Sequence, residues 1–271
     1  MFSLTLCLLA ALAQTYPSEN PFAESPGIAR ADLDGTGTAN YIVAVSDDRV
    51  RVLKTGGGTA TVVAESAPDT MIGSNPRLRL VDLDGDGRPE IVASYPTPRA
   101  SESTWIFHWT GRGLTNIGPT VTVGPRHITH SILGLVEFFD IDGDGVPELV
   151  EFDREAKDIR IRKRSSDGAF KVVRNQVAYI NRYQRHTAEP ELFSGVFDAT
   201  PGQVLEVTVI VEKTVTGGDL HVNGHLVFGS SDFKKARLLK RTIKTEAVNE
   251  VTSTVDGKPG AAIVVMLAPP Q

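Results

Sequence analysis

Cysteine is almost missing from this 271-residue chain: the only one, Cys7, lies in the apolar segment at the N-terminus. A fold held by disulfides is thereby excluded. Common catalytic signatures are missing as well, since the chain has no GxSxG, no HExxH and no phosphate-binding glycine loop. No stretch has a convincing helical pattern. These absences favour a protein that is not an enzyme and in which something other than disulfides provides stapling.

The N-terminal apolar run is too short to span a membrane, which takes about 20 residues. Residues 1–13 are uncharged and apolar and end in Ala-Leu-Ala, which is typical of a secretory signal peptide. Residues 14–26 form a short linker with three prolines. We therefore expect a secreted, extracellular protein (periplasmic or at the cell surface in a bacterium) with no transmembrane span after signal cleavage. A buried N-terminal strand or an uncleaved anchor is the alternative.

The charge is modestly negative, with 28 basic and 33 acidic residues and a formal net charge of −5. Ten of the acidic residues are concentrated in three short loops. The acidity is therefore local, and no feature of the charge pattern indicates a nucleic-acid partner.

One acidic nonapeptide occurs twice, as DLDGDGRPE at residues 82–90 and as DIDGDGVPE at residues 140–148. Carboxylates at positions one, three, five and nine direct oxygens to one point, and glycines at positions four and six permit a tight turn. Without a cation, two carboxylates about 4 Å apart repel by roughly 4 kcal/mol at an effective dielectric near 20. The pattern predicts one Ca²⁺ in each of these two loops.

Three weaker copies of the loop occur at residues 32–40, 198–206 and 254–262. The five loops begin 50, 58, 58 and 56 residues apart, and a period in this range indicates a repeat architecture. Short apolar segments rich in β-branched or aromatic residues precede and follow the two strong loops, which predicts strand, loop, strand. Alternating segments broken by Gly or Ser follow each of the first four loops and predict hairpins.

About four strands per period is the content of one propeller blade. We therefore predict an all-β fold in which residues 27–271 form a β-propeller of about five four-stranded blades. The last blade is incomplete, because only 15 residues follow Asp256. An open ring, or one completed by a partner, is the alternative.

The repeated DxDxDGxxE loop followed by an apolar strand resembles the FG-GAP (or VCBS) repeat, known from the β-propeller of integrin alpha chains. In that family the loop joins the first two strands of a blade. The resemblance implies that Ca²⁺ is held by positions one, three, five and nine and by the backbone carbonyl of position seven. The implied ligands of the two strong loops are Asp82, Asp84, Asp86 and Glu90 with the Arg88 carbonyl, and Asp140, Asp142, Asp144 and Glu148 with the Val146 carbonyl.

The other loops are poorer in carboxylates. The first offers Asp32, Asp34, Thr36, Asn40 and the Thr38 carbonyl, and its lower charge predicts weaker binding of a third ion. We expect no ion in the fourth loop, with Asp198, Thr200 and Glu206, or in the fifth, with Thr254, Asp256, Lys258 and Ala262. In the fifth, Lys258 is predicted to pair with Asp256 in place of an ion.

Two rival interpretations of the acidic loops remain. An EF-hand or dockerin loop requires an acidic residue at position 12 and helical flanks, whereas position 12 is Ala93 in one strong loop and Glu151 in the other. An acidic turn without metal is the second rival. A zinc site at His127 and His130, or at His221 and His225, lacks a third nearby ligand.

Two other patterns have alternative interpretations. Trp105, Phe107 and Trp109 share one strand face, where they form either a sugar-stacking platform or, as we expect, packing between blades. Basic residues cluster in two further segments, where they bind an anionic ligand or, as we favour, protect outer strands from edge pairing. These residues are Arg160, Arg162 and Arg164, and Lys234, Lys235, Arg237, Lys240 and Arg241.

The resemblance implies a secreted, calcium-binding β-propeller that acts as a non-enzymatic recognition or adhesion scaffold for a protein or glycan ligand. Calcium is expected to be structural. A carbohydrate-binding lectin and, less favoured, a polysaccharide-acting enzyme are the alternatives, because propellers serve many functions.

Overall fold

The computed structural model describes residues 27–46, 49–66, 76–96, 102–119, 121–123, 128–130, 135–153, 158–165, 167–189, 191–212 and 214–271. The predicted signal peptide (1–13) and linker (14–26) lie outside the described residues, as does His127. The described part is almost entirely β-structure, with one short helix, α2 (Ser230–Phe233). The all-β prediction is therefore confirmed.

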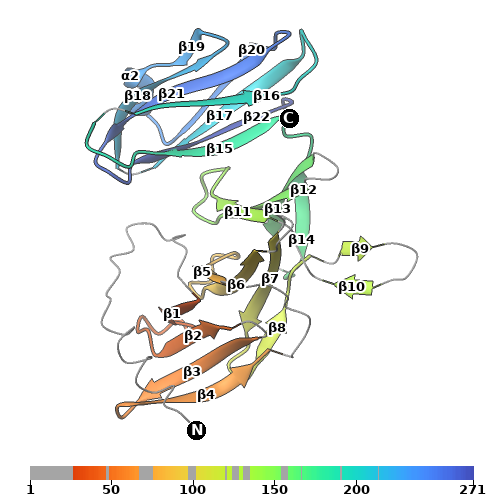
Figure 1. Cartoon of the computed structure of the whole chain (residues 1–271), viewed down its shortest axis with the longest axis vertical. Coiled ribbons are helices and arrows are strands. Elements are labelled where there is room, and N and C mark those ends of the chain that lie inside the picture. The colour runs from red at the N-terminus through yellow and green to blue at the C-terminus, as the bar shows by residue number, and fades with distance from the viewer. Residues whose placement is uncertain are drawn as a thin grey trace.

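Three four-stranded sheets are antiparallel meanders in which strands that are consecutive in sequence pair in order. Sheet 1 contains β1 (Ile28–Ala31), β2 (Tyr41–Val45), β3 (Val50–Gly56) and β4 (Thr59–Glu65). Sheet 2 contains β5 (Arg77–Val81), β6 (Glu90–Pro96), β7 (Glu102–Trp109) and β8 (Leu114–Asn116). Sheet 3 contains β11 (Leu135–Phe139), β12 (Glu148–Asp153), β13 (Asp158–Arg164) and β14 (Phe170–Arg174). A small hairpin of β9 (Val121–Val123) and β10 (Ile128–His130) lies to one side of this series (Figure 1).

The C-terminal third has a different topology, because its strands alternate between two sheets. Sheet 4 has the order β15 (Tyr179–Gln184), β22 (Ala262–Ala268), β17 (Val204–Val211), β20 (Leu238–Lys244). Sheet 5 has the order β16 (Leu192–Phe197), β21 (Asn249–Gly257), β18 (Val215–Val222), β19 (His225–Phe228). Eight strands interleaved in this way form a jelly-roll sandwich.

The predicted fourth and fifth blades are therefore wrong. The loop after β16 joins sheet 5 to sheet 4, and the loop after β21 does the same. Each is an arch over the edge of the sandwich, whereas a blade needs a hairpin within one sheet. Sheet 1 and the sandwich lie at opposite ends of the long axis in Figure 1, so the predicted closed ring of five blades is also wrong.

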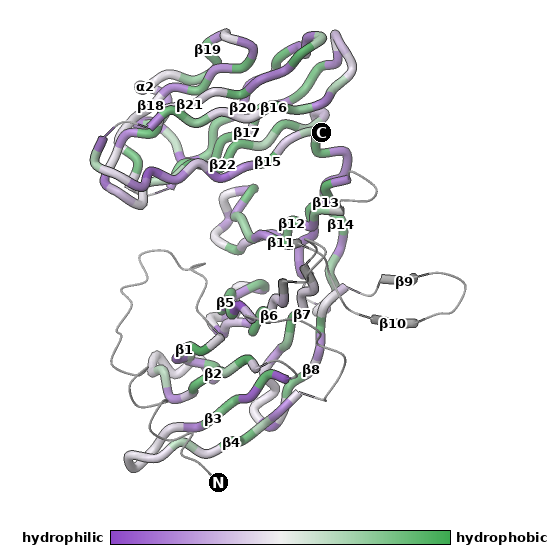
Figure 2. The backbone as a smooth tube through the Cα atoms, viewed as in Figure 1, coloured by the Kyte–Doolittle hydropathy of each residue, from purple (hydrophilic) through white to green (hydrophobic). Residues whose placement is uncertain are grey.

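The five sheets stack face to face with a hydrophobic core between each neighbouring pair. Sheets 1 and 2 enclose one core, sheets 2 and 3 a second, sheets 3 and 4 a third, and sheets 4 and 5 a fourth. Sheets 2, 3 and 4 are consequently covered on both faces. In β22, Val265 and Leu267 face sheet 5 while Val264 and Met266 face sheet 3. Figure 2 shows hydrophobic stretches alternating with hydrophilic ones along the sandwich.

The aromatic residues on β7 are packing residues, as expected. Trp105, Phe107 and Trp109 are each 5 % exposed in the core between sheets 1 and 2, and Trp109 packs on Tyr41 with ring centroids 5.7 Å apart. Buried rings do not offer a sugar-stacking platform. Asn223 and Gly224 form the turn between β18 and β19, where both residues have positive φ.

The basic clusters turn out differently from each other. Arg160, Arg162 and Arg164 lie on β13, which pairs with β12 on one side and β14 on the other, so the prediction of an outer strand is wrong for them. Each instead forms an ion pair with a carboxylate of the chain. Lys240 and Arg241 lie on β20, the last strand in the order of sheet 4, as expected of edge protection. None of the described helices is long and apolar enough to cross a membrane.

Candidate metal sites at the acidic loops

The first, second and third acidic loops (32–40, 82–90 and 140–148) each join the first two strands of a meander sheet, as predicted. Glycines at positions four and six make each turn. Gly85 and Gly87 have φ of +75° and +82°, and Gly143 and Gly145 have φ of +81° and +92°. These left-handed conformations are disfavoured for residues with a Cβ atom, which explains why glycine stands at both positions.

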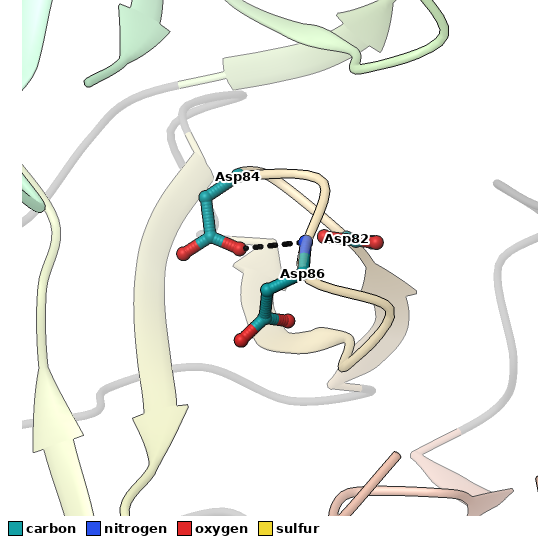
Figure 3. A group of neighbouring side chains, drawn as sticks. All are labelled: Asp82, Asp84 and Asp86. Atoms are coloured by element: carbon teal, nitrogen blue, oxygen red, sulfur yellow. Dashed lines mark hydrogen bonds between the residues drawn. The ribbon is translucent and has the colours of Figure 1, made fainter. Parts of the chain in front are cut away.

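The second loop folds around its own carboxylates. Asp82 accepts hydrogen bonds from the N–H groups of Gly85 (2.8 Å) and Gly87 (2.8 Å). Asp84 accepts one from the Asp86 N–H, and Asp86 accepts one from the Arg88 N–H. Figure 3 shows these three aspartates on the turn, with the Asp84 to Asp86 bond dashed.

The third loop repeats this hydrogen-bond pattern position by position. Asp140 accepts from Gly143 and Gly145, Asp142 accepts from Asp144, and Asp144 accepts from Val146. Because the backbone bonds leave lone pairs on the carboxylates, the aspartates retain the capacity to bind a cation. Oxygens of Asp82, Asp84 and Asp86 lie within 4.8 Å of one another, and so do those of Asp140, Asp142 and Glu148.

The glutamate at position nine of each strong loop is buried beneath the turn. Glu90 is fully buried and Glu148 is 2 % exposed. Each accepts a hydrogen bond from the second residue of its loop, Leu83 N–H at 2.8 Å and Ile141 N–H at 2.7 Å. Burial raises the pKa of both carboxyls despite these bonds. A buried carboxylate needs a compensating cation or hydrogen bonds if it is to remain charged.

Two adjacent cations on β13 face the strong loops. Lys163 Nζ lies 2.6 Å from Asp142 Oδ2, 2.5 Å from Asp144 Oδ2 and 3.1 Å from Glu148 Oε1, all in the third loop. Arg164 Nη1 reaches sheet 2, where it lies 2.6 Å from Asp84 Oδ2 and 2.5 Å from Glu90 Oε1. Arg164 therefore links sheet 3 to the loop of the preceding sheet.

The electrostatics of the third loop follow from these contacts. Partial burial alone would lower the pKa of Lys163, but the carboxylates of Asp142, Asp144 and Glu148 outweigh it and raise that pKa. Desolvation opposes ionisation of Asp144, yet its hydrogen bond with Lys163 and the bond from Val146 N–H hold its pKa below the ordinary value.

The first loop is held by hydrogen bonds more than by charge. Asp32 accepts from the N–H groups of Thr36 (3.0 Å) and Gly37 (2.6 Å), and the Thr36 hydroxyl donates to Asp34 at 2.9 Å. The Thr38 carbonyl, an implied ligand, accepts a bond from the Asn40 N–H. Within the described part of the chain, no group of three His, Cys, Asp or Glu side chains forms here, because Asp32 and Asp34 are the acidic residues of this loop.

The fourth and fifth loops do not form metal cradles among the residues that the structure describes. Asp198, Thr200 and Glu206 are spread over the arch and β17, where Glu206 pairs with Arg174 at 3.3 Å. Both Asp256 and Lys258 are described, and no ion pair joins them, so the predicted substitution of an ion by Lys258 is not supported. The carbonyl roles implied for Arg88 and Val146 stay predictions.

The residues of the strong loops fit a hard divalent cation. All side-chain donors are carboxylate oxygens, the donor type that Ca²⁺ prefers. Glu148 Oε1 is buried, and its polar neighbour among the described residues is the Lys163 ammonium at 3.1 Å, whose geometry does not meet that of a regular hydrogen bond. A cationic ammonium lies among the same oxygens, which shows that this point attracts positive charge.

The first three loops contact one another in sequence order through side chains that pack on glycines. A Cβ atom at Gly85 would meet Val146 Cγ2 at 2.8 Å, and one at Gly35 would meet the Arg88 side chain at 3.3 Å. The residue at position seven of each strong loop therefore packs on the position-four glycine of the loop before it. For Gly143 the corresponding neighbour is Leu238 of the sandwich.

Sequence reasoning missed Lys163, Arg164 and His108 as parts of the sites. His108 Nδ1 lies 3.1 Å from Glu90 Oε1. The only available signal was strand register: if β6 and β7, or β12 and β13, form a hairpin, a residue of the third strand faces the position-nine glutamate. The arginine that reaches a loop in another sheet left no local signal.

Known proteins provide a comparison for the loops. Residues 32–93 and 82–151 match the family model described as an FG-GAP-like repeat. No curated protein matches the chain.

Among solved structures, an exo-β-1,3-galactanase from Phanerochaete chrysosporium is 12 % identical, with 90 % of this chain and 68 % of that chain covered at a TM-score of 0.28. A fructofuranosidase from Schwanniomyces occidentalis is 8 % identical, with 93 % of this chain and 73 % of that chain covered at a TM-score of 0.25. A GH31 α-xylosidase from Xanthomonas citri is 9 % identical, with 92 % of this chain and 31 % of that chain covered at a TM-score of 0.26. Likeness this low supports no inference about fold or activity. Residues 32–151, which hold the three acidic loops, therefore match FG-GAP-like repeats, in agreement with the resemblance of the DxDxDGxxE loops to that family.

Proposed function

We propose that this protein is a calcium-stabilised, non-enzymatic scaffold that recognises another macromolecule. One Ca²⁺ binds in the second loop and one in the third. The observation that carries this proposal is the shared cradle: both loops bond the same backbone N–H groups to the same carboxylate positions and direct a buried glutamate to the same place.

Calcium is favoured over other metals by the donor set. Zinc prefers nitrogen and sulfur ligands, whereas each strong loop offers carboxylate oxygens. Mg²⁺ demands near-ideal octahedral geometry and is seldom held by an all-protein cage. When bound, the ion neutralises the carboxylates and fixes the turn between two strands.

A structural role is favoured by how firmly the ligands are held. The aspartates accept backbone hydrogen bonds and the glutamates are buried, so the ligands are committed to the fold. Secretion, proposed from residues 1–13, would place the protein where calcium is abundant enough for sites in the range of about 10⁻⁴ to 10⁻³ M.

The recognition part of the proposal rests on apolar side chains that the sandwich leaves exposed. Leu192 and Val196 on β16 are 74 % and 75 % exposed, and Leu226 on β19 is 59 % exposed. These residues lie on the two outer strands of sheet 5, and exposed apolar side chains at sheet edges are available to contact another molecule. A glycan array and a calcium-present pull-down distinguish a glycan from a protein ligand. Retention of neither ligand class contradicts the recognition role.

The calcium part is tested by thermal unfolding with and without chelator. We expect chelator to lower the melting temperature by several degrees or more, and Asp84→Ala combined with Asp142→Ala to abolish most of that response. Asp198→Ala is the matched control, because Asp198 occupies position one of a loop that forms no cradle. An identical melting curve in calcium and in chelator would refute the structural role.

A further inference from the structure

We infer that Lys163 is an intramolecular competitor for the divalent cation of the third loop. This inference rests on the proposed function and concerns how strongly that loop binds its ion. In the calcium-free protein the Lys163 ammonium holds the loop, and it has to withdraw before an ion can bind.

The contacts of Lys163 place its charge where an ion would be. Nζ lies 2.6 Å from Asp142 Oδ2 and 3.1 Å from Glu148 Oε1, and these two residues belong to the group of possible metal ligands. Ca²⁺ binds oxygens at about 2.3 to 2.6 Å. An ion held by Asp142 and Glu148 would therefore coincide with the ammonium, so the two occupants exclude each other.

The strand register explains why lysine reaches this loop. Leu149 pairs with Arg162, so the next step along the hairpin sets Glu148 opposite Lys163. The same step sets Glu90 opposite His108 in sheet 2, where Ile91 pairs with Phe107. In sheet 2 the residue at that position, His108, pairs among the described residues with Glu90 alone, at 3.1 Å, whereas Lys163 bridges three carboxylates.

The second loop is balanced in another way. Arg164 approaches it from sheet 3 and contacts Asp84 and Glu90, and Asp82 and Asp86 have no ion pair with it among the described residues. Carboxylate oxygens of Asp82, Asp84 and Asp86 still lie within 4.8 Å of one another. The two strong loops therefore differ: the cation of the second contacts carboxylates at positions three and nine, whereas Lys163 contacts those at positions three, five and nine of the third, so the third should bind calcium more weakly.

Lysine satisfies the third loop only in part. Glu148 Oε1 lies 3.1 Å from Nζ but receives no hydrogen bond from the described residues. A divalent ion brings twice the charge to the same oxygen. Lys163 is also 26 % exposed at its side chain, which leaves it room to move toward solvent.

Calcium titration of the full chain by calorimetry tests the inference. The background carries Asp82→Asn and Asp86→Asn, which weaken the second loop while keeping both ion pairs of Arg164. In this background Lys163→Gln should tighten calcium binding about tenfold or more, within the usual range for coupled ligands. In chelator Lys163→Gln should also melt at a lower temperature, because the carboxylates then lack a counter-charge.

Lys171→Gln is the matched control. Lys171 faces Lys163 across β13 and β14, but its side chain is 62 % exposed and pairs with Asp167. Its removal deletes the same charge one strand away and should leave calcium affinity unchanged. Equal tightening by Lys171→Gln would show a general charge effect and overturn the inference.

Amine labelling of the unmutated chain provides a measurement that does not depend on folding of a variant. Calcium should increase the labelling of Lys163 and leave that of Lys171 unchanged. Unchanged labelling, or unchanged or weakened calcium binding in Lys163→Gln, overturns the competitor role while the proposed function stands. If neither strong loop binds calcium in any variant, the proposed function fails as well.

Discussion

At the scale of single residues, the two glycines of a strong loop share a backbone conformation but differ in their surroundings. Gly85 and Gly87 both have positive φ. A Cβ atom at Gly85 would meet Val146 of the next loop at 2.8 Å, whereas one at Gly87 would meet nothing within 4 Å. Position four is therefore restricted by conformation and by packing, and position six by conformation alone.

This difference predicts that alanine substitutions at Gly85 and Gly87 lower the free energy of unfolding by different amounts. Gly87→Ala should lower the free energy of unfolding by about 1 to 2 kcal/mol, the cost of a left-handed residue with a Cβ atom. Gly85→Ala should cost more, because Val146 also has to move. Denaturant unfolding of both variants in calcium checks the order. Equal losses would show that the contact between the loops contributes nothing.

The buried charge network makes a second prediction at this scale. Arg164 is 7 % exposed at its side chain and faces the fully buried Glu90. Arg164→Gln should cost about 3 to 5 kcal/mol in chelator, because it leaves Glu90 buried beside Asp84 without that cation. Calcium should recover part of this loss.

A surface ion pair serves as the control for Arg164. Arg160→Gln removes a pair with Asp158 that is about one third exposed, and should cost about 0 to 1 kcal/mol. Chemical denaturation with and without calcium measures both variants. A loss for Arg164→Gln no larger than that for Arg160→Gln contradicts the network.

The sequence predicts the loop residues well because their signal is local. Asp, Gly and Glu at fixed positions within nine residues determine the turn, and both strong loops fold as expected. Lys163 and Arg164 lie about 20 and 80 residues from the carboxylates that they contact, at distances set by pairing and stacking of strands. The charge of Arg160, Arg162 and Arg164 suggested an outer strand, because a sequence does not show which strands flank β13.

At the scale of strands and loops, the error in the C-terminal third has a clear cause. The stretches around residues 198 and 256 are strand, loop, strand, as predicted, but the two strands belong to different sheets. A hairpin and an arch look alike over fifteen residues, since only the distant partner of each strand distinguishes them. The sequence signal that separates these two loops from the two strong loops is their smaller number of carboxylates.

Strand β22 allows a prediction about stability, because it contributes side chains to two different cores. Its neighbours Met266 and Leu267 are both fully buried, yet they face different cores. Met266→Ala and Leu267→Ala should each cost about 2 to 5 kcal/mol by leaving a cavity. Leu192→Ala on β16 should cost little, because Leu192 is 74 % exposed. Urea unfolding compares the three, and a negligible loss for Met266→Ala would contradict the core between sheets 3 and 4.

At the scale of the whole molecule, the chain is a row of sheets in which the acidic loops belong to the first three. The sandwich contributes to that row through the core between sheets 3 and 4 and through Arg174, which pairs with Glu206. Calcium should therefore act on the meander sheets directly and on the sandwich only through this contact.

A fragment of residues 175–271 contains all eight strands of the sandwich and tests this division. We expect it to unfold cooperatively, with lower stability than in the full chain, because Ile180 and Met266 lose their cover. Its melting temperature should not respond to chelator. A calcium-dependent melt of the fragment would place a metal site outside the acidic loops.

Calcium titration of the full chain tests the central claim most directly. The account predicts two ions per chain, with the tighter one lost in Asp82→Ala and the weaker one lost in Asp140→Ala. Binding of no calcium, or binding that survives both substitutions together, would contradict it.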